Sequence, residues 1–138
     1  QCGKLYEEQY ISFSDEDFKV TAFLNKMPLA YAAADIIVSR AGAISVSELC
    51  IVGKPVIFIP SPNVAENHQV KNAEAVVAKE AAIMIEEHQL EKEFLTELKQ
   101  LLDHTDQQVR LGQNIKSLAL AEATEAIANE VEKLLPQE

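Results

Sequence analysis

Apolar and polar positions change their period several times along the chain and divide it into strands and helices. Residues 18–24 alternate and are rich in β-branched and aromatic side chains, the pattern of a half-buried strand. Residues 35–39 and 55–59 are centred on continuous apolar runs, which are typical of strands buried on both faces of a parallel sheet. The pattern predicts one more short strand, at residues 82–85.

Helical segments lie between and after these strands. A short helix is predicted at residues 29–34, opened by Pro28, and a longer one at 43–52, closed by Gly53 at the expected C′ position. Further helices are predicted at about 67–79, 89–103, 106–118 and 121–135. This alternation with short connections predicts an α/β fold, a Rossmann-like parallel sheet with helices on both faces. The last three helices are expected to pack across one edge of the sheet.

Length and composition limit the class of protein. The 138 residues, 48% of them apolar, amount to one domain, in which residues 87–138 are expected to form a helical C-terminal segment. Every apolar run is far shorter than the roughly 20 residues of a membrane span. The chain opens at Gln1 without an initiator Met, so it is expected to be a piece of a longer protein.

Charge and cysteine content exclude several partners. Twelve basic and 22 acidic residues give a net charge of −10, whereas nucleic acids and anionic lipids require clustered Lys and Arg. No nucleic-acid partner is therefore expected. The two cysteines, Cys2 and Cys50, form neither a disulfide framework nor a metal-ligand spacing, and we expect a reduced cytoplasmic compartment and no metal site.

The segment that follows the strand at 35–39 has the character of an anion site. Residues 39–45, Ser-Arg-Ala-Gly-Ala-Ile-Ser, lead directly into a helix, and ligands of open parallel sheets bind at the carboxyl ends of the strands. Gly42 would leave room for a ligand to approach the backbone, and the N–H groups of a first helical turn attract anions. The alternative is that Gly42 only permits a tight turn.

Glu48 extends this candidate site along the predicted helix. It lies one turn, about 5.4 Å, beyond Ile44, on the side opposite the Val46, Leu49 and Cys50 face that suits packing on a sheet. This offset is similar to that between the phosphate and the ribose of a nucleotide, and a carboxylate accepts hydrogen bonds from two vicinal hydroxyls. The alternative is an ordinary solvated helical Glu.

The loop after the strand at 55–59 is rich in amide side chains. Amides suit sugar hydroxyls because each offers both a donor and an acceptor. The alternatives here are that Asn67 is an N-cap and that His68 is an ordinary surface histidine.

At these residues the chain resembles the MurG family. The resemblance rests on Ser39–Leu49, Gly53-Lys54-Pro55, Pro60-Ser61-Pro62 and His68–Ala73 in that order, and it extends from residue 3 to about 86. It implies the GT-B arrangement of two Rossmann-like domains, of which this chain resembles the C-terminal, donor-nucleotide half. The first strand, its phosphate loop and the whole N-terminal acceptor domain would then lie upstream of Gln1, and no catalytic residue is expected in this chain.

The resemblance also implies roles for individual residues. The uracil pocket would be lined by Phe23, Leu24 and Met27, for which the alternative is core packing. The diphosphate would be held next to Gly42 by the backbone of Ala43, Ile44 and Ser45 and the Ser45 hydroxyl, and the ribose by Glu48. The N-acetylglucosamine would contact Gln69, with His68, where the family often has a second Gln, and Asn72 as further candidates.

The function that the resemblance implies is an inverting transfer of N-acetylglucosamine from UDP-N-acetylglucosamine to undecaprenyl-diphospho-muramoylpentapeptide, lipid I to lipid II. The reaction would serve peptidoglycan synthesis, and with it cell shape and cell division, without metal or other cofactor. The enzyme would be peripheral at the cytoplasmic face of the bacterial inner membrane, with the lipid acceptor and the membrane contacted by the N-terminal domain and this chain itself soluble. The alternatives are a GT-B transferase for another nucleotide sugar and a non-catalytic nucleotide-binding module.

Overall fold

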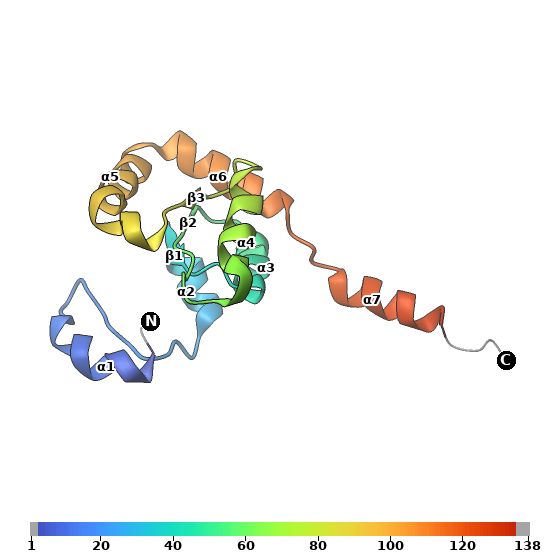
Figure 1. The fold of residues 1–138 in the computed structure, drawn as a ribbon, viewed down its shortest axis with the longest axis horizontal. Coiled ribbons are helices and arrows are strands. Elements are labelled where there is room, and N and C mark those ends of the chain that lie inside the picture. Colours follow the sequence, from blue (N-terminus) through green and yellow to red (C-terminus); the bar gives the residue numbers. More distant parts are fainter. Residues whose placement is uncertain (1–2, 135–138) are drawn as a thin grey trace. The chain divides into compact units, whose positions relative to one another are not determined.

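The computed structural model describes residues 3–134, which belong to two units, one up to Ala34 and one from Asp35 onward. The first unit contains the helix α1 (Lys4–Tyr10), a 3₁₀ turn at Ile11–Phe13 and the helix α2 (Met27–Ala33), shown in Figure 1. Pro28 lies in the first turn of α2, as the sequence predicts. Helix α1 was not predicted by the sequence pattern.

The strand predicted at residues 18–24 is wrong. This segment pairs with no described strand, and three of its backbone donors are satisfied by side chains instead. The N–H of Phe18 donates to Asp15 Oδ1 at 2.6 Å, and that of Val20 to Ser14 Oγ at 2.8 Å. The N–H of Ala22 donates to Glu7 Oε1 at 2.9 Å. These bonds replace the strand ladder that the alternating pattern indicates.

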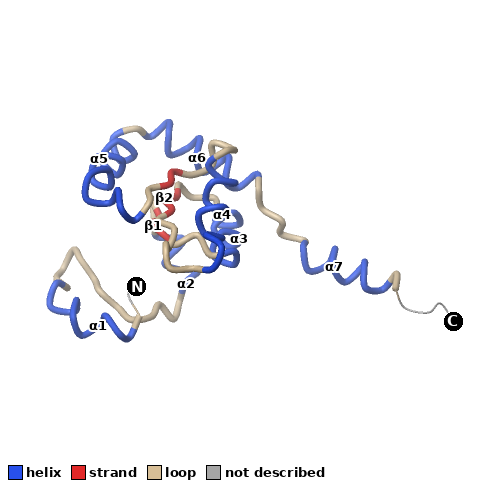
Figure 2. The backbone as a smooth tube through the Cα atoms, in the orientation of Figure 1, coloured by secondary structure: helices blue, strands red, loops and turns tan. Residues whose placement is uncertain are grey.

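The second unit is built on a parallel sheet of three strands in the order β1-β2-β3 (Figure 2). Strand β1 (Ile37–Ser39) pairs with β2 (Val56–Phe58), and β2 pairs with β3 (Ile83–Met84). All three lie within the predicted strand segments. The predicted fold class, a parallel α/β sheet with covering helices, is therefore confirmed.

Strand β2 shows that both faces of the sheet are covered. Its three residues are fully buried, although successive side chains of a strand point to opposite faces. Figure 1 shows α5 on one side of the sheet and α3 and α4 on the other. Strand β1 is an edge strand in the described sheet, and Val38 is 44% exposed. The expectation that this strand is buried on both faces is thus wrong, because the side chain of Val38 on this edge strand is exposed.

The helices of this unit agree closely with the prediction. They are α3 (Ala43–Val52), α4 (His68–Val77), α5 (Leu90–Asp103), α6 (Thr105–Ser117) and α7 (Ala123–Glu132), with 3₁₀ turns at Ala65–Asn67 and Glu87–Gln89. Leu101 of α5 and Leu111 of α6 form a buried cluster with Ile57 and Ile85. Every residue of α7 is exposed. The expectation that the last three helices pack across one edge of the sheet is therefore wrong for α7, whereas α5 and α6 contribute to the core beside β2.

Two glycines bring α6 against the end of α3. Gly53 has the left-handed conformation (φ 68°, ψ 34°) that ends α3, as predicted. A Cβ on Gly112 would lie 2.9 Å from the carbonyl oxygen of Gly53. Only a residue without a side chain permits this approach between the two helices. None of the helices within residues 3–134 has the length and apolar character needed to cross a bilayer.

Candidate functional site

The N-terminus of α3 begins directly after the loop that follows β1. Gly42 is its N-cap residue, and no side chain of the described residues caps the helix. The first intrahelical bond runs from the Val46 N–H to the Gly42 carbonyl at 2.9 Å. The N–H groups of Ala43, Ile44 and Ser45 therefore precede the helical ladder, and such groups together with the helix dipole favour an anion.

The conformation of Gly42 bears on its two interpretations. Its backbone is extended (φ −66°, ψ 147°), a conformation open to any residue, so the turn does not require glycine. A Cβ at this position would meet only Ser45 Oγ, at 3.9 Å, so packing does not require glycine either. Space in front of the helix for a ligand is the interpretation that these observations favour.

Glu48 lies on the exposed side of α3, as the helical pattern predicts. It is exposed together with Ile44, whereas Leu49 and Cys50 are 1% and 5% exposed and face the interior. The carboxylate thus shares the outer side of α3 with the first helical turn. Its role as the ribose acceptor stays a prediction.

The loop between β2 and α4 contains two consecutive residues in the left-handed region, Glu66 (φ 55°) and Asn67 (φ 52°). Such a conformation is unfavourable for most residues other than glycine, less so for Asn, and strained residues of this kind cluster at functional sites. Asn67 occupies the N-cap position of α4, but its side chain makes no capping hydrogen bond. The alternative that Asn67 is the N-cap residue of α4 is therefore confirmed by its position, without a capping hydrogen bond from its side chain.

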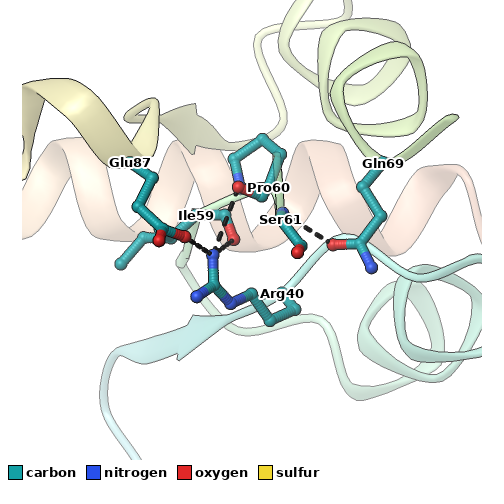
Figure 3. Close-up of polar contacts among 6 residues, drawn as sticks. All are labelled: Arg40, Ile59, Pro60, Ser61, Gln69 and Glu87. Atoms are coloured by element: carbon teal, nitrogen blue, oxygen red, sulfur yellow. Dashed lines mark hydrogen bonds and ion pairs between the residues drawn. The ribbon is translucent and has the colours of Figure 1, made fainter. Parts of the chain in front are cut away.

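The first turn of α4 contains two candidate sugar-binding residues, Gln69 and His68, and one polar side-chain atom of each contacts the preceding loop. Half-buried Gln69 accepts a hydrogen bond from the Ser61 N–H at its Oε1 (2.9 Å), shown in Figure 3. His68 is exposed, and its Nδ1 lies 2.9 Å from the Ala65 carbonyl oxygen. Because a carbonyl oxygen only accepts, Nδ1 is the protonated nitrogen of His68 in this contact.

Asn72 has a structural contact. Its Nδ2 donates to the Ala41 carbonyl at 3.0 Å, across from α4 to the buried residue that precedes Gly42. Asn72 thus supports the loop that leads into α3.

Arg40 is the residue that sequence reasoning missed. It lies in the Ser39–Leu49 motif, but its position in the sequence indicates no role. Its Nη1 donates to the Ile59 and Pro60 carbonyls at 3.2 Å each and to Glu87 Oε2 at 2.5 Å (Figure 3). Glu87 lies 47 residues further along the chain, so no local pattern indicates the pair.

The sequence model of the glycosyltransferase family 28 C-terminal domain matches residues 1–131. The chain belongs to this family. A relative from Flavobacterium psychrophilum is named "UDP-N-acetylglucosamine--N-acetylmuramyl-(pentapeptide) pyrophosphoryl-undecaprenol N-acetylglucosamine transferase". This chain is 56% identical to it over 136 residues, which make up 98% of this chain and 37% of the relative. The protein of the same name from Bacteroides fragilis is 44% identical over 142 residues, 99% of this chain and 37% of the relative. The chain thus spans little more than a third of the length of these curated relatives.

Solved structures agree with this family 28 assignment. The crystal structure of the MurG of Acinetobacter baumannii matches with a TM-score of 0.84 and 27% sequence identity, over 96% of this chain and 40% of that one. The resemblance to the C-terminal half of a GT-B glycosyltransferase is thereby confirmed at the level of the fold.

The candidate uracil-binding residues belong to the first unit of this family 28 chain. Phe23 is 64% exposed, Leu24 is half-buried, and Met27 is half-buried at the start of α2. Phe23 and Leu24 follow a segment that is not a strand, so the predicted position at a strand end is wrong. Their contact with uracil stays a prediction.

Metal-ligating and nucleophilic side chains within residues 3–134 do not form a further site. That part of the family 28 chain contains no group of three His, Cys, Asp or Glu side chains placed to hold a metal ion. Burial raises the pKa of the Cys50 thiol, which keeps it protonated at neutral pH, and the thiolate is the nucleophilic form. Cys50 therefore has a packing role in α3.

Proposed function

We propose that this chain is the donor-nucleotide half of an inverting glycosyltransferase. The complete enzyme transfers N-acetylglucosamine from UDP-N-acetylglucosamine to undecaprenyl-diphospho-muramoylpentapeptide, converting lipid I to lipid II in peptidoglycan synthesis. The names of the close relatives support this substrate pair. The structural observation that supports it best is the uncapped first turn of α3 behind a glycine that neither the turn nor the packing requires.

The first turn of α3 supplies electrostatic stabilisation of the leaving group. As the acceptor hydroxyl attacks the anomeric carbon from the opposite face, negative charge develops on the departing diphosphate. The N–H groups of Ala43, Ile44 and Ser45 are fixed donors for this charge, and preorganised donors are an effective form of catalysis. Because these donors are backbone groups, a chain of net charge −10 binds a dianion without clustered Lys or Arg.

Gln69 and His68 offer complementary hydrogen-bonding groups to the sugar, a donor and an acceptor. Since Gln69 Oε1 is engaged by the Ser61 N–H, its Nε2 is the group that donates to a sugar oxygen. In the tautomer of His68 whose Nδ1 donates to the Ala65 carbonyl, Nε2 is an acceptor. The two neighbouring residues thus provide one donor and one acceptor for the hydroxyls of N-acetylglucosamine.

The remaining parts of the reaction belong to the part of the enzyme outside this chain. We assign to it the catalytic base, the lipid acceptor site and the contact with the cytoplasmic face of the bacterial inner membrane. Within this proposal the reaction supports cell wall growth, cell shape and cell division. Phe23, Leu24 and Met27 contribute the uracil pocket.

Substituting Gly42 tests the proposed function. In Gly42→Ala we expect stability to change by less than about 1 kcal/mol, because the Cβ has space and the lower unfolded-state entropy of Ala opposes its weaker preference for the N-cap position. UDP affinity should fall about tenfold or more, since the methyl group keeps the diphosphate from N–H groups that each contribute roughly 1.5–3 kcal/mol to a charged acceptor. Calorimetric titration and thermal unfolding measure the two effects.

The matched control is Ile51→Ala, on an exposed position near the other end of α3. This variant should bind UDP as the parent does. Unchanged UDP affinity in a folded Gly42→Ala protein would contradict the proposed site, because the diphosphate would then bind elsewhere.

A further inference from the structure

We propose that Arg40 is a positioning residue of the donor-sugar site, and that it acts by orienting Gln69. The inference rests on the proposed function, because it assigns to Gln69 the contact with the sugar. It concerns a residue to which the proposed function assigns no contact with the nucleotide or the sugar. Figure 3 shows the chain of contacts on which it depends.

One guanidinium group connects the carboxyl ends of all three strands. Arg40 follows β1, its Nη1 donates to the Ile59 and Pro60 carbonyls at 3.2 Å each after β2, and it pairs with Glu87 after β3. The loops that follow the strands are where ligands of such sheets bind. Arg40 therefore fixes the start of the β2–α4 loop relative to the ends of β1 and β3.

The decisive feature is the peptide group between Pro60 and Ser61. Its C=O accepts from Arg40 Nη1 at 3.2 Å, and its N–H donates to Gln69 Oε1 at 2.9 Å. Because a peptide group is planar, the direction of its C=O determines the direction of its N–H. The orientation of the Gln69 amide, and with it the direction of Nε2, is thus coupled to Arg40 through one rigid unit.

The two carbonyl contacts matter more here than the ion pair. The side chains of Arg40 and Glu87 are 52% and 41% exposed, and ion pairs at such exposure contribute little to stability. All three contacts are made by the single nitrogen Nη1, and a lysine at position 40 would keep the charge but end one bond nearer the backbone. The coupling to Gln69 therefore depends on where the side chain at position 40 places this nitrogen.

The test compares two ligands in the complete protein. In Arg40→Met we expect the affinity for UDP-N-acetylglucosamine to fall about tenfold while that for UDP changes less than twofold. Arg40→Lys should show the same selective loss, and it replaces Arg40→Met if that variant does not fold. Glu87→Gln should stay within twofold for both ligands because an amide oxygen still accepts from Arg40, and Arg110→Met is the matched control on the exposed side of α6.

A double-mutant cycle with Gln69→Ala separates positioning from general structural support. If Arg40 acts through Gln69, the double variant should bind UDP-N-acetylglucosamine about as weakly as Gln69→Ala alone. Equal losses for UDP and for the UDP-sugar, no loss for either ligand, or additive losses in the cycle would overturn the inference and leave the proposed function intact. A parent protein that binds neither ligand would overturn both.

Discussion

Glu48→Ala is expected to lower the affinity for UDP and UDP-N-acetylglucosamine by roughly 10- to 150-fold. The substitution removes a charge-assisted contact of about 1.5–3 kcal/mol, at about 1.4 kcal/mol per tenfold change. Folding should hardly change, because Glu48 is exposed on the side of α3 opposite the buried Leu49 and Cys50 and Ala is the better helix former. Calorimetric titration of the complete protein measures the affinities.

Two comparisons make the Glu48 experiment specific. A 2′-deoxyribose analogue should already bind the parent more weakly and should lose less on the substitution, because one of the two hydroxyl contacts is absent. Glu74→Ala, which removes an exposed carboxylate from α4, should leave both affinities unchanged. Equal affinities of Glu48→Ala and the parent would mean that Glu48 is an ordinary solvated residue of α3.

Gly112→Ala is expected to destabilise the fold by about 1–3 kcal/mol, the usual cost of overpacking. Its Cβ would lie 2.9 Å from the Gly53 carbonyl oxygen and 3.8 Å from Pro55 Cδ, so α6 must move away from the end of α3. The helix propensity of Ala, favourable by about 1 kcal/mol over Gly, opposes this cost but should not outweigh it. Urea unfolding measures the difference.

The neighbouring exposed residue provides the control for Gly112. Gln113→Ala changes an exposed side chain of the same helix and should alter stability by less than about 0.5 kcal/mol. If Gly112→Ala proved more stable than the parent, α6 would be free to shift, and the close approach of the two helices would not be a constraint on the fold.

Local signals explain which elements were predictable. From residue 35 onward, apolar runs and helical periodicity placed every strand and helix within a few residues, and Gly53 marked the end of α3. Residues 18–24 show the limit of this reasoning. Alternation indicates an extended, half-buried segment, but a strand also needs a neighbour, and Asp15, Ser14 and Glu7 satisfy the donors here. The exposure of α7 could not be predicted either, because helical periodicity indicates an amphipathic helix but not whether the helix packs against the rest of the fold.

In the candidate site, too, features that depend on one element were predictable from the sequence, and contacts between distant residues were not. The start of α3 and the outward side of Glu48 followed from the sequence because both depend on one helix. The contacts of Arg40 with Glu87 and of Asn72 with Ala41 join residues 47 and 31 positions apart, and only the folded chain reveals them. The same holds for Gly42, since only its backbone angles and surroundings show that neither the turn nor the packing requires glycine.

An NMR titration tests the central claim, that the first turn of α3 binds the diphosphate of the donor. Amide resonances of the ¹⁵N-labelled complete protein would be followed as UDP-N-acetylglucosamine is added. We predict large, saturable shifts of the Ala43, Ile44 and Ser45 amides, which the Gly42→Ala variant should require more ligand to reach. Saturable binding that shifts other resonances and leaves these three amides unchanged would contradict the account.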